Sequence, residues 1–150
     1  MEERISFRRC HIGFIFQNFN LIPEMNVFEN IVLPAKLMER SISKKEVIQI
    51  AGELEIEEKL LQSPITLSGG QQQRVAIARA IFTHPTILLG DELTGNLDST
   101  TSISVMKFLK EMCKRYSQTM VIVTHDERMV SMADRIIQMK DGEFIYDGKL

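Results

Sequence analysis

The chain has 150 residues, of which 44% are hydrophobic and 25% charged, and its formal net charge is −2. A chain of this length buries about 70% of the surface that its unfolded form exposes, which allows one domain with a core. The composition excludes disorder, collagen-like repeats and coiled coil, and the charge gives no basic face for nucleic acid. No apolar run approaches the ~20 residues that span a bilayer, and the mixed-charge start is not a secretory signal. We therefore expect a protein of the cytosol that does not bind nucleic acid.

Cysteine and histidine are sparse. Cys10 and Cys113 are far apart in sequence, so we expect buried or half-buried free thiols of a reducing compartment. The histidines at positions 11, 84 and 125 include no pair at helix or turn spacing. The sequence therefore predicts no metal site built from these residues.

The first predicted strand covers residues 12–16, an apolar run that ends in Gln17 and Asn18. Such a run is typical of a buried strand that leads into a loop. By itself, an amide such as Gln17 at the end of a strand is unremarkable.

Residues from about 21 to 66 have a helical character. Asn26, with Glu29 three residues later, forms a capping-box pattern at the start of a helix that Pro34 should bend or end. Ser43 and Glu46 repeat the pattern before a second helix. We predict a small all-helical insert over residues 21–66, flanked by one core made from residues 1–20 and 67–150.

After residue 67 the pattern alternates between strands and helices. Residues 86–89 and 119–123 are continuous apolar runs, which predict strands covered on both faces in a parallel sheet. A strand pair is predicted over residues 135–139 and 143–146, around the turn Asp141-Gly142. The apolar residues at helical spacing that predict a crossover helix are Val105, Phe108, Leu109 and Met112. The fold class is α/β with a helical insertion.

A glycine-containing turn precedes the buried helix predicted after residue 74. Ser68, Gly69, Gly70 and Gln71 begin this segment. The glycines allow close approach of a ligand, and the N-terminus of a helix carries about half a positive charge, so the turn is a candidate anion site. The alternative is an ordinary Ser-Gly-Gly turn before a core helix.

Two adjacent carboxylates, Asp91 and Glu92, follow the strand at residues 86–89. Ligands of open α/β sheets bind at this end of a strand. An aspartate after four apolar residues is typical of Mg²⁺ binding in phosphate-handling sites, and the next carboxylate can orient or deprotonate water. The alternative is a pair of solvated turn residues. His125 ends the strand at residues 119–123 in the same way, where it could also be a structural residue.

In their order along the chain, these residues resemble the nucleotide-binding domain of ABC transporters. Residues 12–17 and 94–99 are most similar to the subfamily that serves lipoprotein-release, macrolide-export and peptide-antibiotic-export systems. The fold implied is a P-loop NTPase-like parallel sheet core with an inserted helical subdomain. The matching motifs are the Q-loop at Gln17, the signature at residues 67–71, the Walker B pair at Asp91 and Glu92, the D-loop at residues 95–98 and the switch histidine at His125.

The resemblance implies that ATP and Mg²⁺ bind between two such domains, identical or different, and that hydrolysis drives a membrane permease. Asp91 would hold Mg²⁺ through water and Glu92 would be the base. Gln17 would contact Mg²⁺ through ATP and, with His125, would sense the γ-phosphate. The residues implied at the nucleotide across the dimer are Ser68, Gly69, Gly70, Gln71 and Asp98.

The resemblance also implies a peripheral position on the inner, cytoplasmic face of the cell membrane. There, the loop of residues 17–23 and the helical insert would contact the permease. Phe19, Leu21 and Ile22 form an apolar cluster in that loop, and exposed apolar patches mark partner sites. The alternative is that these side chains pack beneath the insert.

The sequence departs from the family at two neighbouring positions. Leu93 stands where proline is usual, and Gly90 stands where alanine or another small residue is common. Without the proline, we expect a looser turn at Glu92.

No Gly-x-x-x-x-Gly-Lys-Ser/Thr occurs in the 150 residues, so the Walker A phosphate loop is missing from them. The family places that loop upstream of the Q-loop, and the chain resembles an ABC domain without its N-terminal segment. One alternative function is therefore a catalytically incompetent remnant that acts in dimerisation or permease binding. Another is the tail of a chromosome-maintenance or repair ATPase, which would require long heptads that residues 21–66 lack.

Overall fold

A parallel sheet of three strands lies at the centre of the fold. The structure is a computed structural model that describes residues 2–93, 95 and 97–149. The strands are β1 (Ile12–Ile15), β2 (Ile87–Asp91) and β3 (Thr119–Val123), in the order β1-β2-β3. All neighbouring pairs are parallel. The expected parallel sheet is confirmed.

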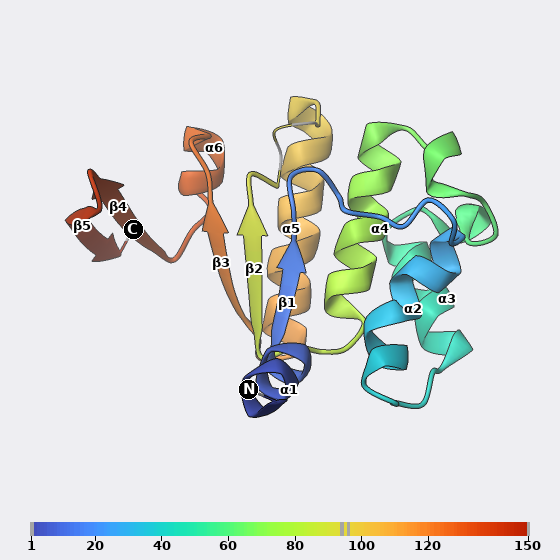
Figure 1. The fold of residues 1–150 in the computed structure, drawn as a ribbon. Coiled ribbons are helices and arrows are strands. Elements are labelled where there is room, and N and C mark those ends of the chain that lie inside the picture. The colour runs from blue at the N-terminus through green and yellow to red at the C-terminus, as the bar shows by residue number, and fades with distance from the viewer. Residues whose placement is uncertain (1, 94, 96, 150) are drawn as a thin grey trace.

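In Figure 1, α5 lies behind the sheet and α4 lies beside β1. α5 (Ser99–Arg115) is the predicted crossover between β2 and β3, and α4 (Gly69–Ile81) is the predicted buried helix. Val105, Leu109 and Met112 of α5 are buried, as their spacing predicts. Both helices begin at the end of the sheet where the strands finish (Figure 1). A short helix, α6 (Glu127–Val130), follows β3 at the same end.

The prediction that both faces of the strands are covered is wrong for β3. Met120 and Ile122 pack against the core, whereas Val121 and Val123 on the other face are 49% and 63% exposed. A continuous apolar run indicates a strand that is able to bury both faces. In the part of the chain that the structure describes, only one face of β3 receives a cover.

The regular secondary structure of residues 27–66 consists of helices. They are α2 (Val27–Leu37), α3 (Lys44–Glu53) and the 3₁₀ helices η1 (Glu57–Lys59) and η2 (Pro64–Thr66). The capping box of α2 is confirmed: the Glu29 amide donates to Asn26 Oδ1 at 2.8 Å, and the Asn26 amide donates to Glu29 Oε2 at 2.9 Å. Of the two outcomes predicted at Pro34, a bend or an end of the helix, the end is wrong, because α2 continues to Leu37. Buried residues on both sides of Pro34 hold the helix together despite the missing donor.

The second capping box forms only by half. Ser43 Oγ accepts from the Glu46 amide at 3.3 Å, as predicted. The Glu46 carboxylate does not return to Ser43; it bonds to the His84 imidazole beyond the end of α4. The Glu46 carboxylate therefore links α3 to the residues after α4 instead of closing the cap of its own helix.

The C-terminal strands form a separate antiparallel sheet, β4 (Arg135–Lys140) and β5 (Glu143–Lys149). Asp141 and Gly142 have φ values of 51° and 84°, the left-handed backbone that a tight hairpin turn of this type requires. The predicted Asp-Gly turn is confirmed, and β5 extends beyond its predicted end at residue 146.

The N-terminal helix α1 (Glu2–His11) has no counterpart among the sequence predictions. Its apolar residues Ile5 and Phe7 are exposed, so the sequence carries no clear buried stripe there. Cys10 lies on this helix and is exposed, which contradicts the expectation of a buried or half-buried thiol. Cys113 is buried as expected, and burial raises the pKa of its thiol. None of the described helices is long and apolar enough to cross a membrane.

Candidate active site

The candidate site lies where β1, β2 and β3 end and where α4 and α5 begin (Figure 1). Ligands of open parallel sheets bind at the carboxyl ends of the strands. The N-termini of two helices add partial positive charge at the same end. The backbone therefore favours an anionic ligand here before any side chain is considered.

Glu92 and His125 meet at this end. The Glu92 amide donates to the Val123 carbonyl of β3 at 3.0 Å, which fastens the residue after β2 to the neighbouring strand. Glu92 Oε1 lies 2.8 Å from His125 Nδ1. The Glu92 side chain is 20% exposed and that of His125 88%. With a proton on Nδ1, the imidazole donates to the carboxylate and leaves Nε2 facing outward.

Leu93 and Gly90 complete the turn around Glu92. Glu92 has φ of 47°, a left-handed conformation that costs about 1–3 kcal/mol in a residue other than glycine. Leu93 is only 2% exposed. Burial of a leucine side chain contributes about 1.5–3 kcal/mol, so it is large enough to offset that strain. The turn is therefore packed, which argues against the looser turn expected from the missing proline.

Gln17 and Asp91 lie beside this turn. A Cβ on Gly95 would lie 3.4 Å from Gln17 Nε2 and 3.6 Å from the Glu92 carbonyl, so the Gln17 amide lies close to the segment that follows Glu92. The Gly95 amide donates to the same carbonyl at 3.1 Å. Asp91 ends β2 and is exposed. Four predicted site residues, Gln17, Asp91, Glu92 and His125, thus belong to one neighbourhood.

The signature segment begins α4 through a reciprocal cap. Ser68 Oγ accepts from the Gln71 amide at 3.3 Å, and Gln71 Oε1 accepts from the Ser68 amide at 3.0 Å. Ser68 and Gly69 are exposed. The Ser68 hydroxyl therefore already serves its own helix, as the ordinary-turn alternative requires, while the first-turn amides of Gly69 and Gly70 take no part in this cap.

Asp98 plays a similar part for α5. Its carboxylate accepts from the Thr101 hydroxyl and, at 3.0 Å each, from the amides of Thr100 and Thr101. These bonds, the one from the Thr101 hydroxyl foremost, hold the pKa of Asp98 below its usual value. A Cβ on Gly70 would meet Leu97 Cδ2 at 3.6 Å, so the signature and the D-loop touch within one chain. Asn96 of the predicted D-loop lies outside the described residues.

Arg79 is a contributor that sequence reasoning missed. Its guanidinium donates to the carbonyls of Phe19 and Asn20 at 2.6 Å each, and so ties α4 to the loop after Gln17. Phe19 and Asn20 both have positive φ, 59° and 48°. The available signal was a single charge within an otherwise apolar helical run. Burial lowers the pKa of Arg79 from its ordinary value.

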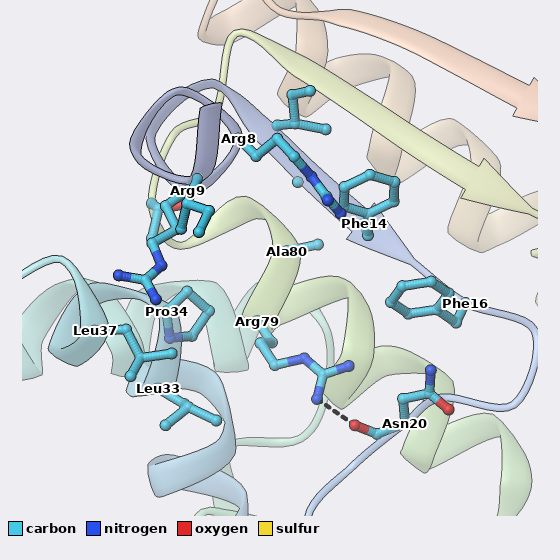
Figure 2. Close-up of a pocket in the computed structure, with 14 residues that line it drawn as sticks. Arg8, Arg9, Phe14, Phe16, Asn20, Leu33, Pro34, Leu37, Arg79 and Ala80 are labelled. Carbon is cyan, nitrogen blue, oxygen red and sulfur yellow. Dashed lines mark hydrogen bonds between the residues drawn. The ribbon is translucent and has the colours of Figure 1, made fainter. Parts of the chain in front are cut away.

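A cavity of about 450 Å³ opens beside this loop, between α1, β1, α2 and α4. Figure 2 shows Phe14 and Phe16 on one side and Pro34 and Leu37 on the other. Arg8 and Arg9 of α1 add positive charge, and Arg8 lies 5.7 Å from the centre of the Phe14 ring. The sequence did not predict this cavity because it did not predict α1.

Comparison with known proteins decides the family. The family model described as "ABC transporter" matches residues 1–95. The chain belongs to the ABC transporter family. A putative ABC transporter ATP-binding protein of Mycoplasma pneumoniae is 38% identical over 96% of the chain, and the macrolide export ATP-binding/permease protein MacB of Rhodopirellula baltica is 41% identical over 93%. The family predicted from the motifs is thereby confirmed, with a macrolide exporter among its relatives.

The fold of an ABC cassette is confirmed as well. The dimeric structure of the ABC transporter cassette MJ0796 matches 99% of the chain with a TM-score of 0.89 and 42% identity. A second structure of MJ0796, a dimer in a post-hydrolysis state bound to ADP and Pi, matches equally well, with 40% identity. The chain spans 66% of MJ0796, 42% of the M. pneumoniae protein and 21% of the R. baltica MacB.

Proposed function

We propose that this chain provides the catalytic carboxylate, the switch histidine and the signature of an ABC-type ATPase that powers a membrane permease. The observation that carries the proposal is the 2.8 Å contact between Glu92 and His125 at the convergent ends of parallel strands. Family membership and the likeness to a cassette bound to ADP and Pi support it.

In this proposal, Glu92 accepts a proton from the attacking water. The half-buried carboxylate is held by the His125 imidazole, so that its free oxygen keeps one direction. His125 Nε2 and the Gln17 amide are the groups placed to sense the γ-phosphate. Proton transfer in this proposal thus depends on the position of the Glu92 carboxylate, which residues at the ends of β1, β2 and β3 determine together.

Mg²⁺ fits the donors at this site. Among the described residues, no group of three or more His, Cys, Asp or Glu side chains gathers in a metal cage. Mg²⁺ in nucleotide sites takes one or two carboxylates together with substrate phosphates, and the exposed Asp91 carboxylate at the end of β2 supplies such an oxygen. Bound there, Mg²⁺ would neutralise charge on the phosphates.

Nucleotide binding in this proposal involves a second ABC domain, identical or different. Ser68, Gly69, Gly70 and Gln71 present the N-terminus of α4 to the phosphates bound by the partner, and Asp98 lies at the same contact. The 150 residues contain no Walker A sequence, so the phosphate loop must come from outside them.

The permease is proposed to contact the cavity and the loop beside it. Phe16 and Leu37 are exposed at the cavity, and Phe19, Leu21 and Ile22 in the loop are half-buried. The half-burial of the loop residues is compatible both with contact to a permease and with packing inside the chain. The apolar cavity, lined also by Arg8, Arg9 and Arg79, suits an apolar segment that carries a carboxylate. We place residues 21–66 as the helical subdomain at this contact, residues 1–20 and 67–150 as the core, and the whole at the cytoplasmic face of the membrane.

A second candidate is a remnant that dimerises or binds a permease without hydrolysis. By themselves, the 150 residues contain no Walker A sequence to hold the phosphates. Phosphoryl transfer depends mainly on positioning and charge stabilisation, which that loop provides.

Phosphate release by two proteins separates these candidates. One is the chain as it stands, and the other is the chain joined to the part of MJ0796 that it does not cover. We expect negligible ATPase activity from the first, turnover from the second, and trapped ATP-bound dimers without turnover when the second carries Glu92→Gln. Glu111→Gln, on the far part of α5, is the control that should keep activity. Unchanged turnover with Glu92→Gln would show that Glu92 is a solvated turn residue.

A further inference from the structure

We propose that Leu93 is a positioning residue: its side chain and the bare Cα of Gly90 form a matched pair that holds Glu92 against His125. This inference rests on the proposed role of Glu92 as the base. Gly90 and Leu93 are the two positions where the chain departs from the usual family residues, and in this proposal the two departures depend on each other.

The geometry of the pair is close. A Cβ built on Gly90 would lie 2.7 Å from both Cγ and Cδ1 of Leu93 and 2.9 Å from its Cδ2. The Leu93 side chain thus occupies the space of a Gly90 side chain. Both residues are buried. A larger side chain at Gly90 would therefore overlap with Leu93, and a smaller side chain at Leu93 would leave a void.

Gly90 and Leu93 flank the turn at Glu92 in the sequence. Gly90 belongs to β2, which is paired on both sides, with β1 and with β3. The Leu93 side chain lies against Gly90, the backbone turns at Glu92 with φ of 47°, and the Glu92 carboxylate contacts His125. Removal of the Leu93 side chain would therefore loosen the turn at Glu92, and a methyl group on Gly90 would displace the Leu93 side chain.

The pair predicts a reciprocal size test. Leu93→Ala leaves a hole over Gly90, and Gly90→Ala creates an overlap with Leu93. The double variant Gly90→Ala/Leu93→Ala places a methyl group in the hole and removes the overlap. The two changes should therefore compensate each other instead of adding.

The position of Glu92 can be measured on the chain itself, without nucleotide. Nitrogen NMR of the His125 imidazole gives the fraction of molecules in which Nδ1 carries a proton. Glu92→Ala defines the value when the carboxylate is absent. We expect each single variant to lose at least half of the difference between wild type and Glu92→Ala, and the double variant to regain at least half of that loss.

Leu109→Ala is the matched control, because Leu109 is a fully buried leucine on α5 away from the turn. It should lower the melting temperature and leave the His125 signal unchanged. The proposal is overturned if Leu93→Ala behaves as Leu109→Ala does, or if the double variant loses the sum of the two single losses. Failure of the proposed function would appear elsewhere, as unchanged ATPase activity of the completed cassette with Glu92→Gln.

Discussion

At the scale of single residues, Arg79 shows how one side chain shapes the loop after Gln17. Its two hydrogen bonds go to the carbonyls of residues whose backbones are left-handed. Hydrogen bonds to a charged group contribute about 1.5–3 kcal/mol each. The left-handed conformations cost about 1–3 kcal/mol each, so the guanidinium is able to offset them.

Arg79→Leu should therefore release the loop of residues 17–23 while α4 remains folded. We expect at least tenfold faster cleavage in this loop by a dilute protease at neutral pH, with a loss of about 2 kcal/mol in unfolding free energy. Arg40→Leu is the control, because Arg40 bonds to the Thr83 carbonyl and does not touch the loop. Equal cleavage of the two variants would contradict the prediction.

Among the residues, sequence pattern was informative where the chemistry lies at the end of a strand. Glu92 and His125 follow apolar runs, and parallel strands bring such ends together. Arg79 could not be predicted because its partners lie 59 and 60 residues away. The packing of Leu93 on Gly90 also depends on the left-handed backbone of Glu92, which the residue types do not predict.

At the scale of elements, the N-terminus of α5 depends on the ionised Asp98. Its pKa is lowered in the folded state, chiefly by the Thr101 hydroxyl, from an ordinary value of 3.8. A group with a lowered folded pKa stabilises the fold fully above its unfolded pKa, and this contribution is lost as pH falls through the folded pKa. The helix dipole acts in the same direction, because it favours negative charge at this end.

Asp98→Ala should lower the melting temperature at pH 7, and its difference from wild type should narrow as pH falls below about 4. Thermal unfolding followed by circular dichroism across this range measures the effect. Asp134→Ala is the control, because Asp134 is exposed and forms a salt bridge with the exposed Lys110. A pH-independent difference for Asp98→Ala would mean that the cap does not require charge.

The elements with local signals were predicted well. Asn26 and Glu29 mark the start of α2, and Asp141-Gly142 marks the hairpin, because both signals act within four residues. The helix α1 and the Glu46–His84 bond were not predicted. The first has its apolar residues exposed, and the second depends on how α3 packs against the end of α4.

At the scale of the whole molecule, the uncovered face of β3 is the feature that favours self-association. Val121 and Val123 are exposed on a strand whose outer edge is not paired with any strand in the described part of the chain. Burial of ~400 Å² of apolar surface contributes on the order of 10 kcal/mol at ~25 cal/mol per Å². An open edge beside such a face is a template for association.

We expect the purified chain to dimerise or aggregate through this face, as light scattering would show. Val121→Thr/Val123→Thr keeps the shape and strand preference of the side chains, and should shift the distribution toward monomer. Ile48→Thr, at an exposed position of α3, should not. A monodisperse wild-type monomer with cooperative unfolding would refute the prediction.

The hairpin of β4 and β5 has a consequence for how the chain opens. It is a sheet of its own, and a two-stranded sheet in water is marginally stable at best. Phe144 is 72% exposed, so little apolar burial protects the ladder between the two strands. Amide hydrogens of residues 135–149 should exchange with solvent through local opening, long before those of β2, whose neighbours flank it on both sides. The chain would then behave as two cooperative units, and its last strands could separate while the candidate site stays folded.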